Sequence, residues 1–334
     1  MAVIFSKLSG QNDSTFKAVE GVLTEIITDV DTGKTKDDEV LSSIFIMDKS
    51  KRFGERSGGL TEFGNAPIVP EGGAAPVDDI QEGFGKLIEH VTLKKYFTTT
   101  KEMADDNRLS MMKLAAANFT RSFKRSALQM ATNYLVAEGT TYTYEGTTLD
   151  RTTGDGKALF ATDHPGKRSG VSTQSNVFTN AFGSDIVMLN RLANIGRNYK
   201  NESGNVLGYT FDTIIIPGNT PALEEVCNRI IGTAGVVGNA NNDINTQKGK
   251  WKLIINHRWE AASGTAPYII MSSEARDELD ALKFYDRTPL TVSNDVDNKT
   301  WNLEWSGFRR ISAVCNNWRA MLMGGAQSGT TLSV

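Results

Sequence analysis

The chain has 334 residues, of which 39% are hydrophobic and 22% charged, a balance typical of a globular protein with one elaborate domain or two smaller ones. Its formal net charge is −3 and its pI is about 5.8, so it lacks the overall basic field that usually drives binding to nucleic-acid phosphates. A nucleic-acid reader is therefore disfavoured.

The first predicted element is an amphipathic helix within residues 1–50. Its apolar side chains recur at helical spacing after Ser14 and Thr15, at Phe16, Val19, Leu23, Ile26 and Ile27. The polar run at 31–39 predicts an exposed turn, and 41–47 a short strand or helix. Because little apolar surface follows locally, the helix must dock elsewhere on the chain or on a neighbour. We therefore expect residues 1–50 to form an N-terminal arm.

Residues 54–85 differ in composition from the segments on either side, because they contain eight glycines and three prolines. No regular element tolerates that density, and a loop of this length is uncommon unless it is functional. The flanking segments read as strands, since Val91, Leu93 and Phe97 fall on alternate positions after the loop. Residues 51–100 are predicted to form a long two-stranded excursion that projects from the body.

A long helix follows, with an N-cap predicted at Asp105 or Asp106 and a stop at Gly139. Its apolar positions recur every three or four residues, at Leu109, Met112, Ala116, Phe119, Phe123, Ala127, Met130 and Tyr134. The solvent-exposed faces of the helix are expected to carry the basic residues Arg108, Lys113, Arg121, Lys124 and Arg125. About 30 residues at 1.5 Å each would form a spine of roughly 45 Å.

The remaining segments mix helices and strands. Residues 139–183 predict turns and short hairpins. Helices are then expected through Ile186 to Ala193, from Thr220 with Pro221 at its first position, and over Ala275, Leu279 and Leu282. Strands are expected at 211–217, 251–256 and 268–272, and the segments 307–315 and 318–324 as successive antiparallel strands. Because this order has no regular βαβ rhythm, the fold class is α+β.

The sequence contains none of the common catalytic, phosphate or metal signatures. Asp163 and His164 are the most enzyme-like pair, but adjacent residues rarely face each other and Pro165 fixes a turn after them, so we favour a polar turn. Cys227 and Cys315 predict buried free thiols. No apolar run is long enough for a membrane span or secretory signal, which predicts a chain that is soluble and cytoplasmic when made. We predict no catalytic, cofactor or metal site.

Aromatic residues gather in the last quarter of the chain, where Trp301, Leu303 and Trp305 alternate beside Arg309, Arg310 and Arg319. Such a pattern can stack on single-stranded nucleic acid. It can also pack one face of a sheet, and the net acidity of the chain favours that interpretation.

The order of these segments resembles that of tailed-bacteriophage major capsid proteins. The matching phrases are Pro70-Glu71-Gly72, Asp78-Asp79, the strand Val91 to Lys94, and Asp105-Asp106 before the spine. The phrase at 155–166 is similar to one in Mu-like major head subunits. The segments at 205–226 and 238–256 look like the strand, helix and Asn-rich loop of their axial domain. The resemblance extends over roughly residues 40–325.

The resemblance implies the Hong Kong 97 fold and a structural role without enzymatic activity. It places the spine helix and peripheral-domain strands at 101–183, the axial domain at 184–260, and the peripheral-domain return with C-terminal strands at 261–334. The implied assembly-loop residues are Arg52, Phe53, Arg56, Phe63, Pro70, Glu71, Asp78 and Asp79. The spine core is expected at Leu109, Met112, Phe119, Phe123 and Met130.

The resemblance also implies the partners. The chain would assemble with itself into pentamers and hexamers, with a separate scaffolding protein, a portal and decoration proteins, around double-stranded DNA held by non-specific proximity, and with no membrane. It would reside in the virion capsid after assembly in the bacterial host cytoplasm. One alternative is an encapsulin-type nanocompartment shell on the same fold, which would enclose an enzyme instead of DNA. A second is a soluble hydrolase-like enzyme that uses Asp163 and His164.

Overall fold

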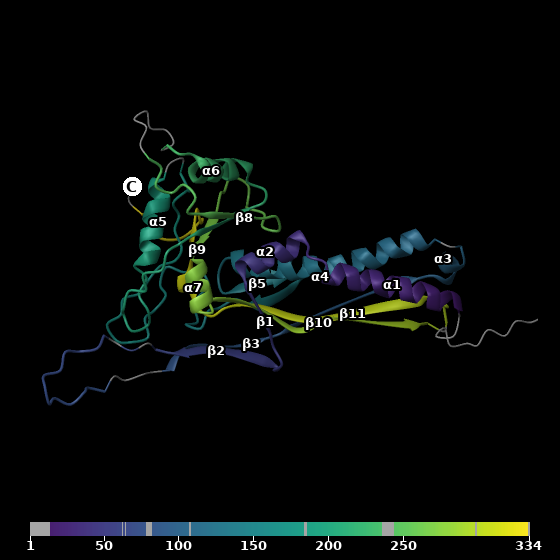
Figure 1. The fold of residues 1–334 in the computed structure, drawn as a ribbon, viewed down its shortest axis with the longest axis horizontal. Coiled ribbons are helices and arrows are strands. Elements are labelled where there is room, and N and C mark those ends of the chain that lie inside the picture. The colour runs from purple at the N-terminus through teal and green to yellow at the C-terminus, as the bar shows by residue number, and fades with distance from the viewer. Residues whose placement is uncertain are drawn as a thin grey trace, which may run out of the picture.

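The computed structural model describes residues 14–61, 63, 65–77, 82–106, 108–183, 186–235, 244–297 and 299–332. Within them, two four-stranded sheets and two two-stranded hairpins combine with helices in an α+β architecture. In Figure 1 an elongated layer of long strands and helices lies horizontally, and a second, more compact part rises from one end of it. The predicted fold class is confirmed.

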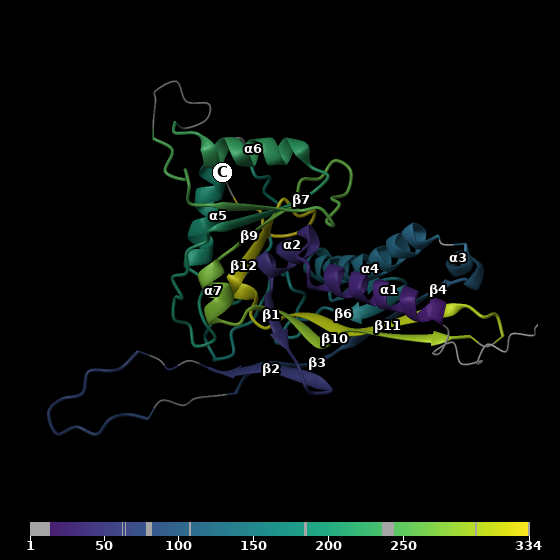
Figure 2. The same cartoon turned by 45° about the vertical axis from the view of Figure 1, so that its right-hand side comes forward.

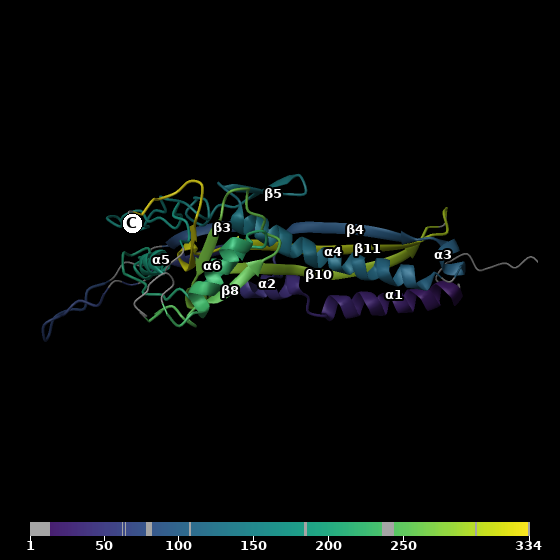
Figure 3. The same ribbon diagram turned by 90° about the horizontal axis from the view of Figure 1, so that it is seen from above.

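The elongated layer is built on the sheet with order β1-β10-β11-β4. Its strands are β1 (Ile46–Lys49), β10 (Leu282–Val296), β11 (Leu303–Cys315) and β4 (Val91–Thr99). β1 pairs parallel with β10, and the other two pairings are antiparallel. We call this the long sheet. Helices cover one of its faces, as the view from above shows (Figure 3).

The central helix on that face is α4 (Leu109–Val136), the predicted spine. Of its expected core residues, Met112, Phe119, Phe123 and Met130 are buried, and Leu109 is partly buried. Its rings lie almost directly on β11, because a Cβ placed on Gly307 would come within 2.7 Å of the Phe119 ring. Only a residue without a side chain permits this approach, so Gly307 sets the distance between helix and sheet.

Both predicted ends of the spine were wrong. A separate short helix, α3 (Lys101–Asp105), precedes α4, and the hydroxyl of Thr100 caps it by accepting from the Met103 amide. Asp106 is the C-terminal cap of α3, whereas α4 begins after Arg108 with no side-chain cap. At the other end α4 stops at Val136, three residues before Gly139.

Arg151 closes the C-terminal end of α4. Its guanidinium is fully buried and donates to the carbonyls of Tyr134, Leu135 at 2.8 Å and Gly139 at 3.1 Å. A helix C-terminus favours a cation, because its unpaired carbonyls carry partial negative charge. Burial lowers the pKa of Arg151 to about 10, so the group stays charged at neutral pH. The sequence offered no local signal for this cap, since Arg151 lies beyond the hairpin β5–β6 (Thr141–Tyr144, Thr147–Asp150).

The N-terminal segment packs on the same chain's spine. Its helix α1 (Ser14–Thr32) lies beside α4 (Figure 3), where Val19, Leu23 and Ile27 join a core cluster with Met112 and Trp305. The polar run expected as a turn in fact starts a second helix, α2 (Lys36–Ile44). The reason is a capping box, in which Thr35 and Asp38 satisfy each other's backbone amides.

Lys124 was predicted to be exposed to solvent, but its side chain is buried. Its ammonium lies 2.9 Å from the Asp38 carboxylate and donates to the Gly33 carbonyl at 2.6 Å. The side chain therefore joins α4 to the turn between α1 and α2. Burying a charge is tolerated only when it is paired in this way.

The compact part contains the sheet β12-β9-β7-β8. Its elements are α5 (Val187–Arg197), β7 (Thr213–Pro217), α6 (Pro221–Gly232), β8 (Lys252–Asn256), β9 (Tyr268–Met271), α7 (Ser273–Glu278) and β12 (Met321–Gly324). Strands β7 and β9 are buried along their whole length, which explains why they read as unbroken apolar runs. Both cysteines are free and buried as predicted, and burial raises the pKa of the Cys227 thiol to about 12.

Two predictions in the C-terminal third were wrong. Leu282 does not share a helix face with Ala275, because α7 ends at Glu278 and Leu282 begins the 15-residue strand β10. The segments 307–315 and 318–324 are not successive antiparallel strands. The first belongs to β11 in the long sheet, and the second forms a 3₁₀ helix (Trp318–Ala320) followed by β12 in the other sheet.

Candidate assembly surface

The predicted two-stranded excursion is the antiparallel hairpin β2–β3 (Gly54–Leu60, Glu82–Glu89). It lies against the face of the long sheet that the helices leave open, and its connecting loop extends past the end of the body (Figures 1 and 2). The ion pair Arg56–Glu82, at 2.6 Å, links its two strands, but both side chains are 72% exposed. Such a pair contributes little rigidity. The hairpin is therefore held mainly where it joins the body, at residues 50–53 before β2 and at His90 after β3, which we call the root.

His90 fastens that root. It lies between β3 and β4 and is buried, with Nε2 3.0 Å from the Ser50 hydroxyl and Nδ1 2.9 Å from the Ser312 hydroxyl. Ser50 donates its only hydroxyl proton to Glu55 at 2.7 Å, so it accepts from Nε2–H, and Nδ1 accepts from Ser312. One neutral imidazole therefore joins the entry to the hairpin, its exit and strand β11.

Burial, reinforced by the nearby cations of Arg310 and Arg287, lowers the pKa of His90 below its ordinary value. Glu55 acts in the opposite direction but does not cancel this effect. The neutral form is also the one that the two hydroxyl contacts use. The root is thus built around an uncharged histidine, a state that the sequence alone did not indicate.

Lys86 holds the middle of β3. Its ammonium lies 2.7 Å from the Asp150 carboxylate and donates to the Thr152 carbonyl at 2.7 Å. Burial opposes ionisation of Asp150, but hydrogen bonds from Lys86 and Thr152 outweigh it and lower the pKa of this carboxyl. Gly154 lets the chain pass close by, since a Cβ there would come 3.1 Å from the Phe84 carbonyl. These contacts press β3 onto the turn after β6.

Beyond the root, the loop is exposed to solvent with its apolar side chains outward. Ile68, Val77 and Phe63 are 101%, 96% and 62% exposed, and Phe53 at the root is 70% exposed. Exposed apolar side chains gathered on one projecting segment are typical of a surface that a partner covers. The Gly72 backbone, at φ 77°, closes a tight turn in which the Gly73 amide donates to the Pro70 carbonyl.

The predicted assembly residues follow this segment but do not form one cluster. Arg52 and Phe53 lie at the root, where the Arg52 carbonyl accepts from Arg287 at 2.8 Å. Arg56 lies on β2. Phe63, Pro70 and Glu71 are exposed along the loop. Asp78 and Asp79 lie outside the described residues. Sequence reasoning missed His90 and Lys86, and only the rarity of histidine in the chain could have drawn attention to the first.

Comparison with known proteins concerns this architecture as a whole. No protein-family model matches the sequence, and no curated protein is similar to it. The structure is similar to the capsid of an empty GTA particle, with a TM-score of 0.55 and 10% identity over 87% of this chain and 91% of that one. It is also similar to a chain of Mycobacterium phage Patience (TM-score 0.54, 10% identity, 92% and 87% covered). The capsid of Myoviridae phage XM1 gives a TM-score of 0.51 at 14% identity, with 85% and 90% covered.

The chain has the Hong Kong 97 fold. The fold expected from the order of the sequence segments is therefore confirmed, with α4 as its spine helix and β2–β3 as its extended hairpin.

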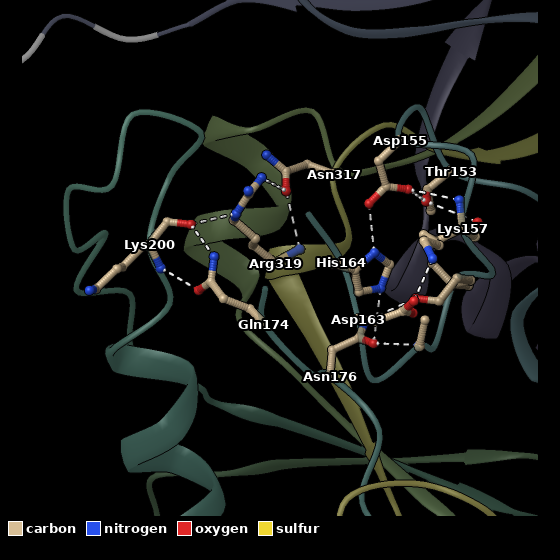
Figure 4. A network of polar contacts seen from close by, with 12 residues as sticks. Thr153, Asp155, Lys157, Asp163, His164, Gln174, Asn176, Lys200, Asn317 and Arg319 are labelled. Carbon is tan, nitrogen blue, oxygen red and sulfur yellow. Dashed lines mark hydrogen bonds and ion pairs between the residues drawn. The ribbon is translucent and has the colours of Figure 1, made fainter. Parts of the chain in front are cut away.

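The Hong Kong 97 fold of this chain does not bring Asp163 and His164 together. His164 is fully buried, stacks on Trp318, and faces Asp155 at 2.7 Å and Asn176 at 3.2 Å (Figure 4). Asp163 instead pairs with Lys157. With both ring nitrogens engaged and no exposed surface, His164 has no route to a substrate, so the hydrolase alternative loses its only candidate residues.

The described residues contain no group of three or more His, Cys, Asp or Glu side chains arranged to hold a metal ion. None of their helices combines the length and the apolar character needed to cross a membrane. Trp305, one of the aromatic residues considered for stacking on nucleic acid, is instead buried in the protein, where it stacks on Phe97 beneath the spine.

Proposed function

We propose that this chain is a capsid subunit of a tailed bacteriophage, which assembles with copies of itself into a closed shell around the genome. The observation that carries the proposal is the projecting hairpin, fastened at its root and bearing exposed apolar side chains at Ile68 and Val77. The Hong Kong 97 fold, shared with the phage capsids named above, supports it.

The hairpin explains how a shell could form from weak contacts. Covering one fully exposed aliphatic side chain contributes roughly 1.5–3 kcal/mol. A pair of subunits that associates at millimolar strength gains only about 4 kcal/mol, but a subunit held by several neighbours gains several such terms at once. Contacts between different patches close into a shell only when the rotation per subunit is right. Single weak contacts allow misplaced subunits to dissociate.

The two parts of the fold would have different roles in the shell. We propose that residues 184–260 form the axial domain, which gathers subunits around fivefold and sixfold positions. In the same proposal, residues 101–183 and 261–334 form the peripheral domain, 51–100 the extended loop, and 1–50 an arm that rests on its own spine. A separate scaffolding protein, a portal and decoration proteins complete the assembly in the host cytoplasm.

Electron microscopy of the purified chain tests the proposal, with a loop deletion as its sharpest variant. Removing residues 58–83 joins Ser57 to Phe84, and because Ser57 pairs with Lys86 the hairpin can close through the two residues between them. We expect a folded chain that forms no closed particles. Normal shells from this deletion would contradict the role of the loop.

A milder variant controls for damage to the fold. Ile68→Ser with Val77→Ser removes two apolar side chains that make almost no contact within the chain, so its unfolding midpoint should not change. Assembly should then require a subunit concentration higher by at least tenfold, because tenfold corresponds to 1.4 kcal/mol. Particles filled with DNA would support a phage head, whereas a packaged enzyme would identify an encapsulin-type shell.

A further inference from the structure

A groove of about 840 Å³ runs along α4, between β4, the start of α2 and the turn after β8. Its cationic lining residues are Lys36, Lys95, Arg121, Lys124, Arg125 and Arg258. Asp37 is the one carboxylate in the lining, so six cations against one anion give a formal charge of +5, with histidine left out of the count. The groove is therefore positively charged, although the chain as a whole has a net charge of −3.

Four of these six cations have no partner among the described residues. Lys124 is paired with Asp38, and Arg258 lies 3.1 Å from Asp37. The other four are exposed, and within the described part of the chain their charged ends make no ion pair or hydrogen bond. The 28-residue helix α4 contains no acidic residue that could neutralise them. Unpaired cations on several walls of one groove suit an anion with several charges.

The position of the groove restricts what can occupy it. Its lining residues come mainly from α4, β4 and the start of α2. Helices α1, α2 and α4 lie on one face of the long sheet, whereas the hairpin β2–β3 lies on the opposite face (Figures 1 and 2). Subunits side by side in a shell present the same face to the same side. A neighbour's hairpin therefore lies on the other surface of the shell and does not reach the groove.

We infer that the groove binds the phosphate backbone of the enclosed double-stranded DNA, and that the α4 face is the inner surface of the shell. This inference rests on the proposed function. The four unpaired cations supply about four phosphate contacts, and such contacts depend on salt and not on base sequence. DNA is then held by a defined site on each subunit rather than only by confinement.

The test measures binding of the full-length, unassembled chain to a fluorescein-labelled 30-base-pair duplex by anisotropy, at salt concentrations from 50 to 200 mM. Four phosphate contacts predict a slope of log K against log salt of about −3.6. Arg121→Gln with Arg125→Gln should reduce the slope by about 1.8 and weaken binding at 50 mM salt. The matched control is Lys113→Gln with Lys94→Gln, which removes the same charge from exposed residues outside the groove and should change neither value.

Each outcome decides between defined alternatives. Equal weakening by both double variants would show general attraction and overturn the groove as a site. Polyglutamate of matched charge that binds more tightly than the duplex would show that the groove takes an acidic protein segment instead. Electron microscopy of the same variants under assembly conditions separates this inference from the proposed function, because shells from the arginine variant with unchanged DNA binding would refute only the groove. Absence of shells from the unaltered chain, also when its scaffolding protein is supplied, would refute the function, whatever the DNA binding.

Discussion

Replacing Asp38 with asparagine should destabilise the unassembled chain by about 3 kcal/mol, because it leaves the buried Lys124 ammonium without its ion-pair partner. That value is the low end for such a change, since Lys124 keeps its hydrogen bond to the Gly33 carbonyl. Asparagine retains an oxygen that can accept from Thr35, so most of the capping box survives. The loss therefore reports the charge and not the helix cap.

The opposite replacement should cost much less. Lys124→Met removes the cation and leaves Asp38 with a side chain that is 36% exposed and still able to cap α2, so we expect a loss of about 1 kcal/mol or less. Combining the two changes removes both charges from the site. The double variant should be more stable than Asp38→Asn alone by about 2 kcal/mol, because no charge is then buried without a partner.

Urea unfolding followed by tryptophan fluorescence measures all four states of this cycle under one condition. The sign of the coupling matters more than its size. A double variant less stable than Asp38→Asn would refute the argument, because it would mean that Lys124 stabilises the turn without its carboxylate. Equal losses for the two single variants would also contradict the difference in burial on which the prediction depends.

Three further predictions concern the spine and the hairpin root. Gly307→Ala should cost about 1–3 kcal/mol by overpacking against Phe119, and Phe119→Leu in the same chain should recover part of it in urea unfolding. Arg151→Met should cost about 3 kcal/mol or more, because the buried carbonyls of Tyr134 and Leu135 lose their donor, and protection of the last turn of α4 from hydrogen exchange should fall. His90 has a lowered pKa in the folded chain, so its contribution to stability is complete above about 6.5 and is lost as the pH falls through the folded value. Protection factors for hydrogen exchange in β3, corrected for the intrinsic exchange rate at each pH, should fall between pH 7 and pH 5, and His90→Gln should remove that fall; an unchanged pH dependence would exclude His90 as its source.

Much of the spine could be predicted from sequence because its signal is local. The side chains of Met112, Phe119, Phe123 and Met130 recur at helical spacing, and burial of one stripe follows from that pattern alone. Its ends could not be predicted in the same way. Asp106 had the right residue type for a cap, but Thr100 had already started a shorter helix.

The strand β10 was missed because it has no clean alternation of apolar and polar residues. Its first part, from Leu282 to Tyr285, is mostly buried, whereas the rest alternates between partly and fully exposed positions, with register shifts on both sides of Thr288. A strand that changes its surroundings along its length carries two patterns, and neither is long enough to stand out.

The candidate surface was predicted in part, for a related reason. Glycine and proline density located the loop, because those residues exclude regular structure. The root contacts of His90 and Lys86 join residues 40 to 222 positions apart, and no local pattern encodes such distances. The groove on α4 was also not foreseen, since its cations come from four separate segments of the chain.

Because the hairpin is held mainly at its root, a small tilt there produces a larger displacement at its far end. Strand β3 has eight residues, which corresponds to a length of about 26 Å, so a tilt of about 10° around His90 would move its far end by about 5 Å. A displacement of that size is comparable to the spacing between neighbouring strands. Small adjustments among a few hydroxyl and imidazole contacts could thus change where one subunit meets the next, and a single sequence could serve positions of different local curvature.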